Sequence, residues 1–433
     1  MDFIEKIKDA GVVGAGGAGF PTDRKLNCRA ETFIVNGIEC EPLLRTDRYV
    51  MEQYAPRIVR TVQAIREHLG AGRAVIALKK HYEKAAGEIV SAAKGTDIEV
   101  YLSDSFYPAG DEQNLVFSVT GQTVPTGGIP LDVGCVVSNV STVLNIADAL
   151  EDKPVTDKLV TVAGSVASPG ILQCPVGTPL SRLLEAAGGA VKDCAYIIGG
   201  PLMGQVTEDL SQPVTKTTGG LLAIPKGHIL LTRKVFDEQR EARMARAACS
   251  QCSFCTQLCP RNAMGLNVQP HKAMRALAAG NEVLLGDING IFSCCDCGLC
   301  TYYACNFGMK PGKAMQMAKQ KLQQQGYKVR KEVHNSPDPG SRLKRVPTER
   351  LLARLDLMQF DRDLPFLGTV SCSDVKIPLK MHIGGPDEPV VRPHMRVDKG
   401  DPIAKAKGMG AHIHASITGE VVQVTDTFIE LRG

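Results

Sequence analysis

The sequence predicts a multidomain chain that begins with an α/β domain, continues with a cysteine-rich helical domain and ends with a small β domain. Three observations predict it. Short apolar strands alternate with helical patterns up to about residue 150, cysteines gather in two runs between residues 249 and 305, and short strands separated by Gly turns fill residues 365–433. At 433 residues the chain is long enough for two to four domains.

The alternation in the first part predicts an α/β fold with a mostly parallel sheet. We expect strands at residues 32–35, 74–78, 98–102 and 133–139, and helices at 50–70 and 82–94. Residues 1–10 carry Phe3, Ile4 and Ile7 at helical spacing. This spacing predicts either a packed first helix or a short amphipathic targeting peptide.

Two features of this domain are candidates for ligand binding. A glycine-rich loop runs from Gly11 to Thr22, and its backbone N–H groups could approach a phosphate or a flat ring closely. The loop lacks the preceding strand of a dinucleotide-binding fingerprint. Glu39, Glu41 and Asp47 follow the first strand, where they could bind ribose hydroxyls or a nicotinamide amide, or could be ordinary solvated loop residues.

The two cysteine runs have the spacing of iron–sulfur ligands. The first reads C-x2-C-x2-C-x3-C-P and the second C-x2-C-x2-C-x4-C. In two-cluster ferredoxins the fourth cysteine of each run ligates the other cluster. We therefore assign two [4Fe–4S] clusters, one with Cys249, Cys252, Cys255 and Cys305, the other with Cys294, Cys297, Cys300 and Cys259.

Structural zinc and disulfides are the alternatives for these cysteines. Zinc sites usually contain two well-separated C-x2-C pairs, which two four-cysteine runs fit less well. No signal peptide and no long apolar run is seen, so we expect a reducing compartment in which disulfides are rare. Cys295 breaks the spacing of the second run, and we leave it out of the ligand set.

Four segments together resemble a known superfamily. They are the loop Gly14-x-Gly-Gly-Ala-Gly-Phe-Pro-Thr22, the motif Asn36-x-x-Glu39-x-Glu41-Pro42, the motif Tyr107-x-x-Gly110-Asp111-Glu112 and the motif Asn139-Val-x-Thr142. They resemble the NADH-binding flavoprotein subunit of respiratory complex I. The C subunit of Rnf complexes and PduS-type cobalamin reductases are more similar still.

The resemblance implies one FMN with NADH stacked on it. Carried over by position, the flavin phosphate end would contact Gly14, Gly16, Gly17, Gly19 and Lys25. The flavin ring and ribityl chain would contact Asn36, Asn139 and Thr142. The flavin or the dinucleotide would face Glu39, Glu41, Tyr107, Gly110, Asp111 and Glu112.

The resemblance also divides the chain into domains. It implies an FMN- and NADH-binding α/β domain at residues 1–153, a β-grasp soluble-ligand-binding domain at 154–232 and a two-cluster ferredoxin-like domain at 233–330. A linker at 331–364 and a barrel-sandwich, lipoyl-like domain at 365–433 would follow. The last domain lies at the C-terminus, whereas in the Rnf C subunit it is N-terminal, and this order resembles the PduS type.

These parts predict an oxidoreductase. A flavin can accept an electron pair and pass single electrons on, so we expect a path from NADH through FMN to the two clusters. The resemblance implies cobalamin as the electron acceptor, in support of a B12-dependent diol dehydratase. The alternatives are an Rnf C-like subunit of a ferredoxin:NAD⁺ oxidoreductase and an electron-transfer module without its own NADH site.

Partners and location are expectations of the same resemblance. It implies a cytoplasmic protein inside a bacterial microcompartment, with an adenosyltransferase or shell proteins as partners. A net charge of +4 does not favour nucleic-acid binding. No stretch near 20 apolar residues predicts a transmembrane segment.

Overall fold

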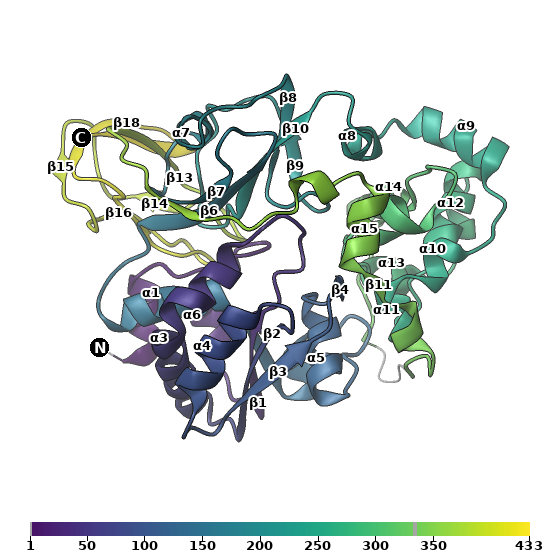
Figure 1. Cartoon of the computed structure of the whole chain (residues 1–433), viewed down its shortest axis with the longest axis horizontal. Helices are drawn as coiled ribbons and strands as arrows, with labels where there is room; N and C mark the ends of the chain where they lie inside the picture. The colour runs from purple at the N-terminus through teal and green to yellow at the C-terminus, as the bar shows by residue number, and fades with distance from the viewer. Residues whose placement is uncertain (1, 332–335) are drawn as a thin grey trace.

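The computed structural model describes residues 2–331 and 336–433. In Figure 1 the N-terminal domain lies below a sheet formed by the middle of the chain, the C-terminal strands lie at the upper left, and the helices of the cysteine-rich part lie on the right. The cysteine-rich part therefore approaches both the N-terminal domain and the middle sheet.

The N-terminal domain is an α/β layer structure with a parallel sheet in the order β3-β2-β1-β5. Its strands are β1 (Thr32–Gly37), β2 (Arg73–Lys79), β3 (Ile98–Ser103), β4 (Phe106–Tyr107) and β5 (Cys135–Asn139). Its helices are α1 (Phe3–Asp9), α2 (Thr22–Leu26), α3 (Thr46–Leu69), α4 (Glu83–Ala93), α5 (Glu112–Thr120), the 3-10 turn η1 (Pro130–Val133) and α6 (Val140–Leu150). All the strands and helices predicted for this domain are confirmed.

Both faces of this sheet are covered because its strands are apolar on both sides. Phe33 and Val35 of β1 pack in one core with helices α1, α3, α4 and α6. Ile34, which points to the opposite face, packs with Leu115 of α5 in a second core. This arrangement places the carboxyl ends of the neighbouring strands β1 and β5 side by side.

The first helix is packed rather than free. The Ile7 side chain is fully buried, and the Phe3 ring stacks on His68 with 4.5 Å between centroids. Lys6 Nζ donates to the carbonyl of Leu150 at 3.0 Å. Of the two alternatives for residues 1–10, the structure shows the packed helix.

The middle of the chain forms a six-stranded sheet in the order β12-β7-β6-β10-β8-β9. Its elements are β6 (Asp157–Gly164), β7 (Gly170–Pro175), α7 (Leu180–Ala186), β8 (Cys194–Ile198), β9 (Gln205–Thr207), β10 (Gly220–Pro225) and β12 (Phe366–Thr369). Leu180, Leu183 and Leu184 of α7 pack onto its apolar strands. The edge strand β12 comes from far along the chain and pairs in parallel with β7.

The cysteine-rich domain is built from short helices. They are α8 (Ile229–Lys234), α9 (Glu238–Ala248), α10 (Phe254–Gln257), α11 (Pro260–Ala263), α12 (Pro270–Ala279), η2 (Glu282–Leu285), α13 (Ile288–Phe292), the π-helical turn η3 (Cys300–Ala304) and α14 (Pro311–Gln324). Apolar residues of α9, α12 and α14 form its core, together with Cys259 and Cys305.

The segment predicted as a linker is structured where the chain is described. It contains η4 (Ser341–Lys344), β11 (Val346–Pro347), α15 (Thr348–Arg354) and η5 (Met358–Phe360). Strand β11 pairs antiparallel with β4 of the N-terminal domain. Leu351 and Leu357 are buried in one core with Leu43 and Leu299, so this segment ties the N-terminal and cysteine-rich domains together.

The C-terminal domain contains a four-stranded and a three-stranded sheet, in the orders β13-β19-β18-β15 and β14-β16-β17. Its strands are β13 (Asp374–Pro378), β14 (Glu388–Pro389), β15 (Arg396–Val397), β16 (Pro402–Lys405), β17 (Ile413–His414), β18 (Gly419–Val424) and β19 (Phe428–Arg432). A shared apolar core lies between the sheets. Lys216 of the middle domain joins three parts of the chain, because its Nζ donates to the carbonyls of Gly11 and His412 at 2.7 Å each.

The predicted fold class is confirmed in all four parts. The exact domain boundaries remain predictions. Within residues 2–331 and 336–433, no helix is long and apolar enough to cross a membrane.

Candidate functional site

Two asparagines meet at the carboxyl edge of the parallel sheet. Asn36 at the end of β1 lies opposite Asn139 at the end of β5. Asn36 Nδ2 donates to the carbonyl of Gly110 at 2.9 Å. Asn139 caps helix α6 by accepting from the Ser141 amide, and its Nδ2 donates to Asp47 at 2.7 Å. This edge is where open α/β sheets bind ligands, and the structure brings to it two residues predicted for the flavin ring, Asn36 and Asn139, and one predicted for the flavin or the dinucleotide, Gly110.

The glycine-rich loop is fastened beside this edge. The Ala15 amide donates to Thr142 Oγ1 at 2.9 Å, and Lys158 Nζ donates to the Ala15 carbonyl at 3.0 Å. The loop closes on itself through the Gly14 amide, which donates to the Phe20 carbonyl at 2.9 Å. Thr142 therefore contacts the loop directly, as expected for residues that share one ligand.

The centre of the loop offers free hydrogen-bond donors. Within the part of the chain that the structure describes, the amides of Gly16, Gly17, Ala18 and Gly19 have no hydrogen-bond partner. A Cβ added to Gly16 or Gly17 would meet nothing within 4 Å, so a ligand can approach this backbone closely. Successive free N–H groups of this kind suit a phosphate, and the loop therefore fits the phosphate end of FMN.

Glu39 lies at the amino end of helix α3. Its carboxylate accepts from the amides of Asp47 at 3.0 Å and Arg48 at 3.3 Å. Burial and the nearby Asp47 carboxylate raise the pKa of Glu39 to about 7. Lys79 Nζ donates to the Glu39 carbonyl at 3.0 Å, and burial lowers the pKa of this lysine. Glu39 is thus held beside the sheet edge as a group that can change protonation near neutral pH.

A buried acid, Asp47, and a buried base, Lys158, accompany the loop. The sequence indicated Asp47 only as one of the acidic groups after the first strand, and it did not indicate Lys158. Asp47 accepts from Ser141 Oγ at 2.7 Å as well as from Asn139, and burial raises its pKa. Burial lowers the pKa of Lys158 to about 8, with Asp47 acting in the opposite direction. The available signal was a single lysine next to an apolar strand, which periodicity alone does not distinguish from a surface residue.

Lys25 and Glu112 form one partly exposed pair. Lys25 Nζ lies 2.8 Å from Glu112 Oε1. Lys25 was predicted to contact the flavin phosphate and Glu112 the flavin or the dinucleotide, and here each side chain neutralises the charge of the other. Their joining brings α2, which follows the loop, to the start of α5.

Glu41 and Tyr107 lie where three domains meet. The Glu41 carboxylate accepts from the amides of Leu202 at 2.9 Å and Met203 at 3.1 Å, and burial raises its pKa. The Tyr107 hydroxyl lies 3.1 Å from Glu41 Oε1 and 2.8 Å from the carbonyl of Cys297. The structure therefore places these two residues against the middle sheet and the second cysteine run.

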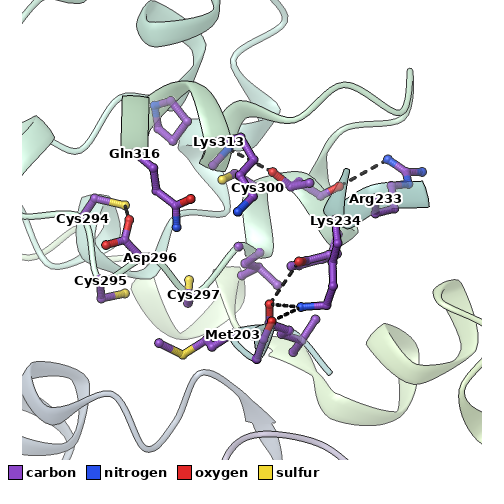
Figure 2. A pocket seen from close by; sticks show the side chains of 18 of the residues that line it. Met203, Arg233, Lys234, Cys294, Cys295, Asp296, Cys297, Cys300, Lys313 and Gln316 are labelled. Carbon is purple, nitrogen blue, oxygen red and sulfur yellow. Dashed lines mark hydrogen bonds between the residues drawn. The ribbon is translucent and has the colours of Figure 1, made fainter. Parts of the chain in front are cut away.

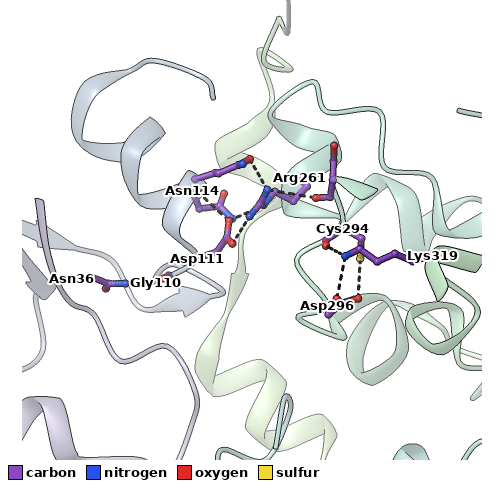
Figure 3. A network of polar contacts seen from close by, with 10 residues as sticks. Asn36, Gly110, Asp111, Asn114, Arg261, Cys294, Asp296 and Lys319 are labelled. Carbon is purple, nitrogen blue, oxygen red and sulfur yellow. Dashed lines mark hydrogen bonds and ion pairs between the residues drawn. The ribbon is translucent and has the colours of Figure 1, made fainter. Parts of the chain in front are cut away.

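Asp111 also reaches the cysteine-rich domain, as Figure 3 shows. Both of its carboxylate oxygens accept from Arg261, at 2.7 and 2.8 Å, and both side chains are almost completely buried. Arg261 follows Cys259 by two residues, and its Nη1 lies 3.4 Å from the carbonyl of Ser293, next to Cys294. A bidentate ion pair thus joins the Gly110–Asp111 turn to both cysteine runs.

The cysteines of the first run gather with the last cysteine of the second. Burial raises the pKa of Cys255 to about 12, and the neighbouring thiols that raise it further are those of Cys305, Cys249 and Cys252. Cys252 is exposed. This grouping has the membership proposed for the first cluster.

The second run gathers around Cys259. Burial raises the pKa of Cys294 and Cys300 well above the ordinary value, and the Cys259 thiol is among the neighbours that raise it further. A hydrogen bond with Cys295 and burial raise the pKa of Cys297, and the Cys259 thiol adds to them. The Cys255 thiol of the first group also raises the pKa of Cys300, so the two groups are adjacent. No three His, Cys, Asp or Glu side chains of residues 2–331 and 336–433 converge as ligands of a single metal ion. With Cys295 as a ninth, additional cysteine in the second group, the two neighbouring sets of four predicted ligands suit two cubane clusters.

The second group lies nearer to the flavin edge. It is contacted from the N-terminal domain by Tyr107 and, through Arg261, by Asp111. The first group lies beyond it and includes the exposed Cys252. Cys295 hydrogen-bonds with Cys297 inside the second group, and this bond lowers its pKa.

The family comparisons follow the same division of the chain. Residues 7–148 match the Nuo51 FMN-binding domain, residues 159–206 the SLBB domain, residues 248–310 a 4Fe-4S dicluster domain and residues 364–432 the RnfC barrel sandwich hybrid domain. The chain therefore carries an FMN-binding domain and a 4Fe-4S dicluster domain.

Similar proteins were found both among curated sequences and among solved structures. The chain is 40% identical to the cobalamin reductase PduS of Salmonella typhimurium, over 98% of this chain and 95% of that protein. It is 33% identical to the C subunit of the proton-translocating ferredoxin:NAD(+) oxidoreductase complex of Clostridium ljungdahlii, over 59% of this chain and 54% of that protein. A chain of the NAD+-reducing [NiFe]-hydrogenase in the air-oxidized state matches with a TM-score of 0.47 and 21% identity, over 83% of this chain and 67% of that chain.

The fold and the two sites define an oxidoreductase that combines a flavin with two iron–sulfur clusters. Among such proteins, the similarity to PduS extends over all four domains. The chain belongs to the PduS cobalamin reductase family.

Proposed function

We propose that this chain is an NADH-dependent cobalamin reductase that passes electrons from NADH through FMN and two [4Fe–4S] clusters to cobalamin. The observation that carries the proposal is the extent of similarity to PduS, which covers 98% of the chain and includes the C-terminal domain. Bound FMN supplies the exchange between the electron pair of NADH and the single electrons that the clusters carry.

The residues at the sheet edge support a flavin in one orientation. The free amides of Gly16, Gly17 and Gly19 suit its phosphate, while Asn36 and Asn139 offer amide groups to its ring and ribityl chain. In this proposal the ring end lies toward Gly110, whose neighbour Asp111 is bound to Arg261.

The contacts of the residues predicted to face the flavin or the dinucleotide suggest two different roles. Glu39 and Glu112 stay on the N-terminal domain and are proposed to face the flavin or the dinucleotide. Glu41, Tyr107 and Asp111 contact the other domains and are proposed to hold the cysteine-rich domain against the flavin edge. The ligand sets proposed for the clusters are those given by the sequence, with Cys305 and Cys259 exchanged between runs.

Anaerobic reconstitution tests the function. Iron, sulfide and FMN are counted, NADH is added, and aquacobalamin is then offered as acceptor. The proposal predicts that NADH bleaches the flavin and cluster absorbance and that cobalamin is reduced. Reduction of the clusters without consumption of cobalamin would show a general NADH dehydrogenase module instead.

The alternative is an electron-transfer protein like the C subunit of the Rnf complexes. It is favoured by the match to the RnfC barrel sandwich hybrid domain and by the 33% identity to the C subunit of a ferredoxin:NAD(+) oxidoreductase complex. Co-purification with integral membrane proteins, together with loss of activity in the isolated chain, distinguishes it from the reductase. Failure of NADH to bleach the flavin would instead indicate an electron-transfer module without an NADH site.

We also propose that the chain works inside a bacterial microcompartment, where it supplies reduced cobalamin for a diol dehydratase. An adenosyltransferase or shell proteins would then be its partners. The packed helix α1 offers Lys8 and Glu5 but not its buried Ile7 to such a partner. Deleting residues 1–8 tests whether this helix has any part in encapsulation, with the thermal stability of the protein as the control for its packing role.

A further inference from the structure

A large cavity lies between the middle sheet and the cysteine-rich domain. Its volume is about 1090 Å³, which includes the space among Cys259, Cys294, Cys297 and Cys300 that the second-run cluster would fill. Its walls come from the β8–β9 hairpin, the end of α8, the second cysteine run and helix α14. Figure 2 shows Gln316 of α14 beside Cys294 and Lys313 of α14 beside Cys300, with Arg233 and Lys234 of α8 on the right. A molecule in this cavity would therefore lie next to the second-run ligands.

The cavity extends well beyond the cysteines, along one face of α14. Lys313, Gln316, Gln320 and Gln323 recur at helical spacing on this face and line the cavity. The opposite face of the helix, with Met315 and Leu322, is buried in the core of the cysteine-rich domain. The polar face is therefore fixed toward the cavity by the packing of the apolar one.

Two of these four polar side chains, Lys313 and Gln316, are partly enclosed by the cavity, whereas Gln320 and Gln323 are exposed. Lys313 Nζ and the Gln316 carboxamide make no hydrogen bond or ion pair within the part of the chain that is described, and both are half-buried. The other cations at the cavity are already engaged. Lys234 Nζ donates to the carbonyls of Leu202 and Gly204, and Lys319 Nζ lies 3.4 Å from Asp296.

The charge of the lining is positive. Five cations contribute, and Asp296 is the one acidic residue among the described lining residues; the cations are Arg233, Lys234, Arg261, Lys313 and Lys319. A ligand with an anionic group is therefore favoured.

The mouth of the cavity is apolar. Met203, Val206 and Val235 line it and are 53%, 45% and 67% exposed, which is high for large apolar side chains. Such residues offer contact area to a flat, apolar molecule.

We propose that this cavity binds the corrinoid that accepts the electrons, an inference that rests on the proposed function. A cobalamin combines a broad macrocycle with peripheral amides and one phosphodiester. The macrocycle would lie against Met203 and Val206, and the amides and the phosphodiester would bind Gln316 and Lys313. The first-run cysteines other than Cys259 do not line the cavity, so electrons reach the corrinoid from the second-run cluster.

Binding is measured directly, without turnover. Aquacobalamin is equilibrated by dialysis with anaerobically reconstituted, oxidised holoprotein, and its dissociation constant is compared among variants. Lys313→Ala and Gln316→Ala each remove one ligand contact and should weaken binding about tenfold. Met203→Trp narrows the mouth and should weaken it at least as much. Iron and FMN counts and the EPR spectrum of the reduced protein verify that each variant is fully loaded.

Lys321→Ala is the matched control, because Lys321 lies on the same helix but pairs with Glu238 at the surface. It should bind aquacobalamin as the wild type does. Equal binding by wild type, Lys313→Ala, Gln316→Ala and Met203→Trp would overturn the cavity assignment and leave the proposed function intact. Displacement of aquacobalamin by NAD⁺, which supplies no electrons, would also overturn it, because the cavity would then be a dinucleotide site. No binding by any protein, the wild type included, would instead contradict cobalamin as the acceptor.

Discussion

The ion pair between Arg261 and Asp111 gives the sharpest test of how the flavin and cluster domains are joined. Arg261→Met removes the charge and keeps an apolar side chain of useful length, so Asp111 remains buried without its partner. The two side chains are only 11% and 10% exposed, which leaves little solvent to screen the remaining charge. Breaking a buried pair of this kind costs about 3–5 kcal/mol.

Urea unfolding of the loaded protein measures this cost. The midpoints of wild type and variant are compared at an unchanged m value, because only then does a shift in midpoint report stability. Lys331→Met is the matched control, since Lys331 also joins the cluster side of the chain to the N-terminal domain, through Asp132, but is 65% exposed. Its loss should change stability by at most about 1 kcal/mol.

A second substitution separates the effect of the unpaired Asp111 charge on stability from the effect of altered packing. Adding Asp111→Asn to Arg261→Met removes the unpaired carboxylate and keeps a residue that can cap α5. The double variant should therefore recover part of the lost stability. If Arg261→Met unfolds within about 0.5 kcal/mol of the wild type, as a surface substitution does, the pair does not hold the domains together.

Three further predictions concern the two sites. Cys305→Ser should remove the EPR signal of the first-run cluster and retain that of the second; loss of the second signal alone would show that the fourth cysteines are not exchanged between runs. Burial raises the Glu39 pKa to about 7, above its unfolded value of about 4.3, so this group reduces stability as pH rises between those values; Glu39→Gln should flatten the pH dependence of the urea midpoint in that window, and an unchanged slope would contradict the raised pKa. Gly16→Val should weaken FMN binding, measured by fluorescence, without lowering the thermal stability of the flavin-free protein, because its Cβ would meet nothing within 4 Å. Gly19→Ala should lower that stability, because its Cβ would lie 2.8 Å from the Met381 carbonyl at a φ of +67°. Unchanged FMN binding by Gly16→Val would place the phosphate elsewhere.

Much of the fold could be predicted because it depends on local patterns. Short apolar runs in segments such as 32–37 and 73–79, alternating with helical patterns, predicted the parallel strands, and cysteine spacing predicted the cluster loops. The glycine-rich loop was also recognisable, since few other sequences leave several backbone amides free in succession.

Contacts between distant segments could not be predicted in the same way. Asp111 and Tyr107 were expected at the flavin or the dinucleotide, and their contacts with Arg261 and the Cys297 carbonyl depend on how two domains dock. The pairing of β12 with β7 has the same origin, because an edge strand carries no local sign of its partner. Lys158 was overlooked, since it is buried against the glycine-rich loop, where its Nζ donates to the Ala15 carbonyl, and this loop lies far from it in the sequence.

The central claim is that electrons from NADH leave this chain on cobalamin. The most direct test is a stoichiometric titration of the NADH-reduced, anaerobic holoprotein with aquacobalamin, followed by absorbance and EPR together. The account predicts that the flavin and cluster signals are reoxidised in step with the appearance of reduced cobalamin, up to the number of electrons that the flavin and the two clusters hold. Flavin and clusters that stay reduced in the presence of excess aquacobalamin, yet are reoxidised by ferredoxin, would contradict it.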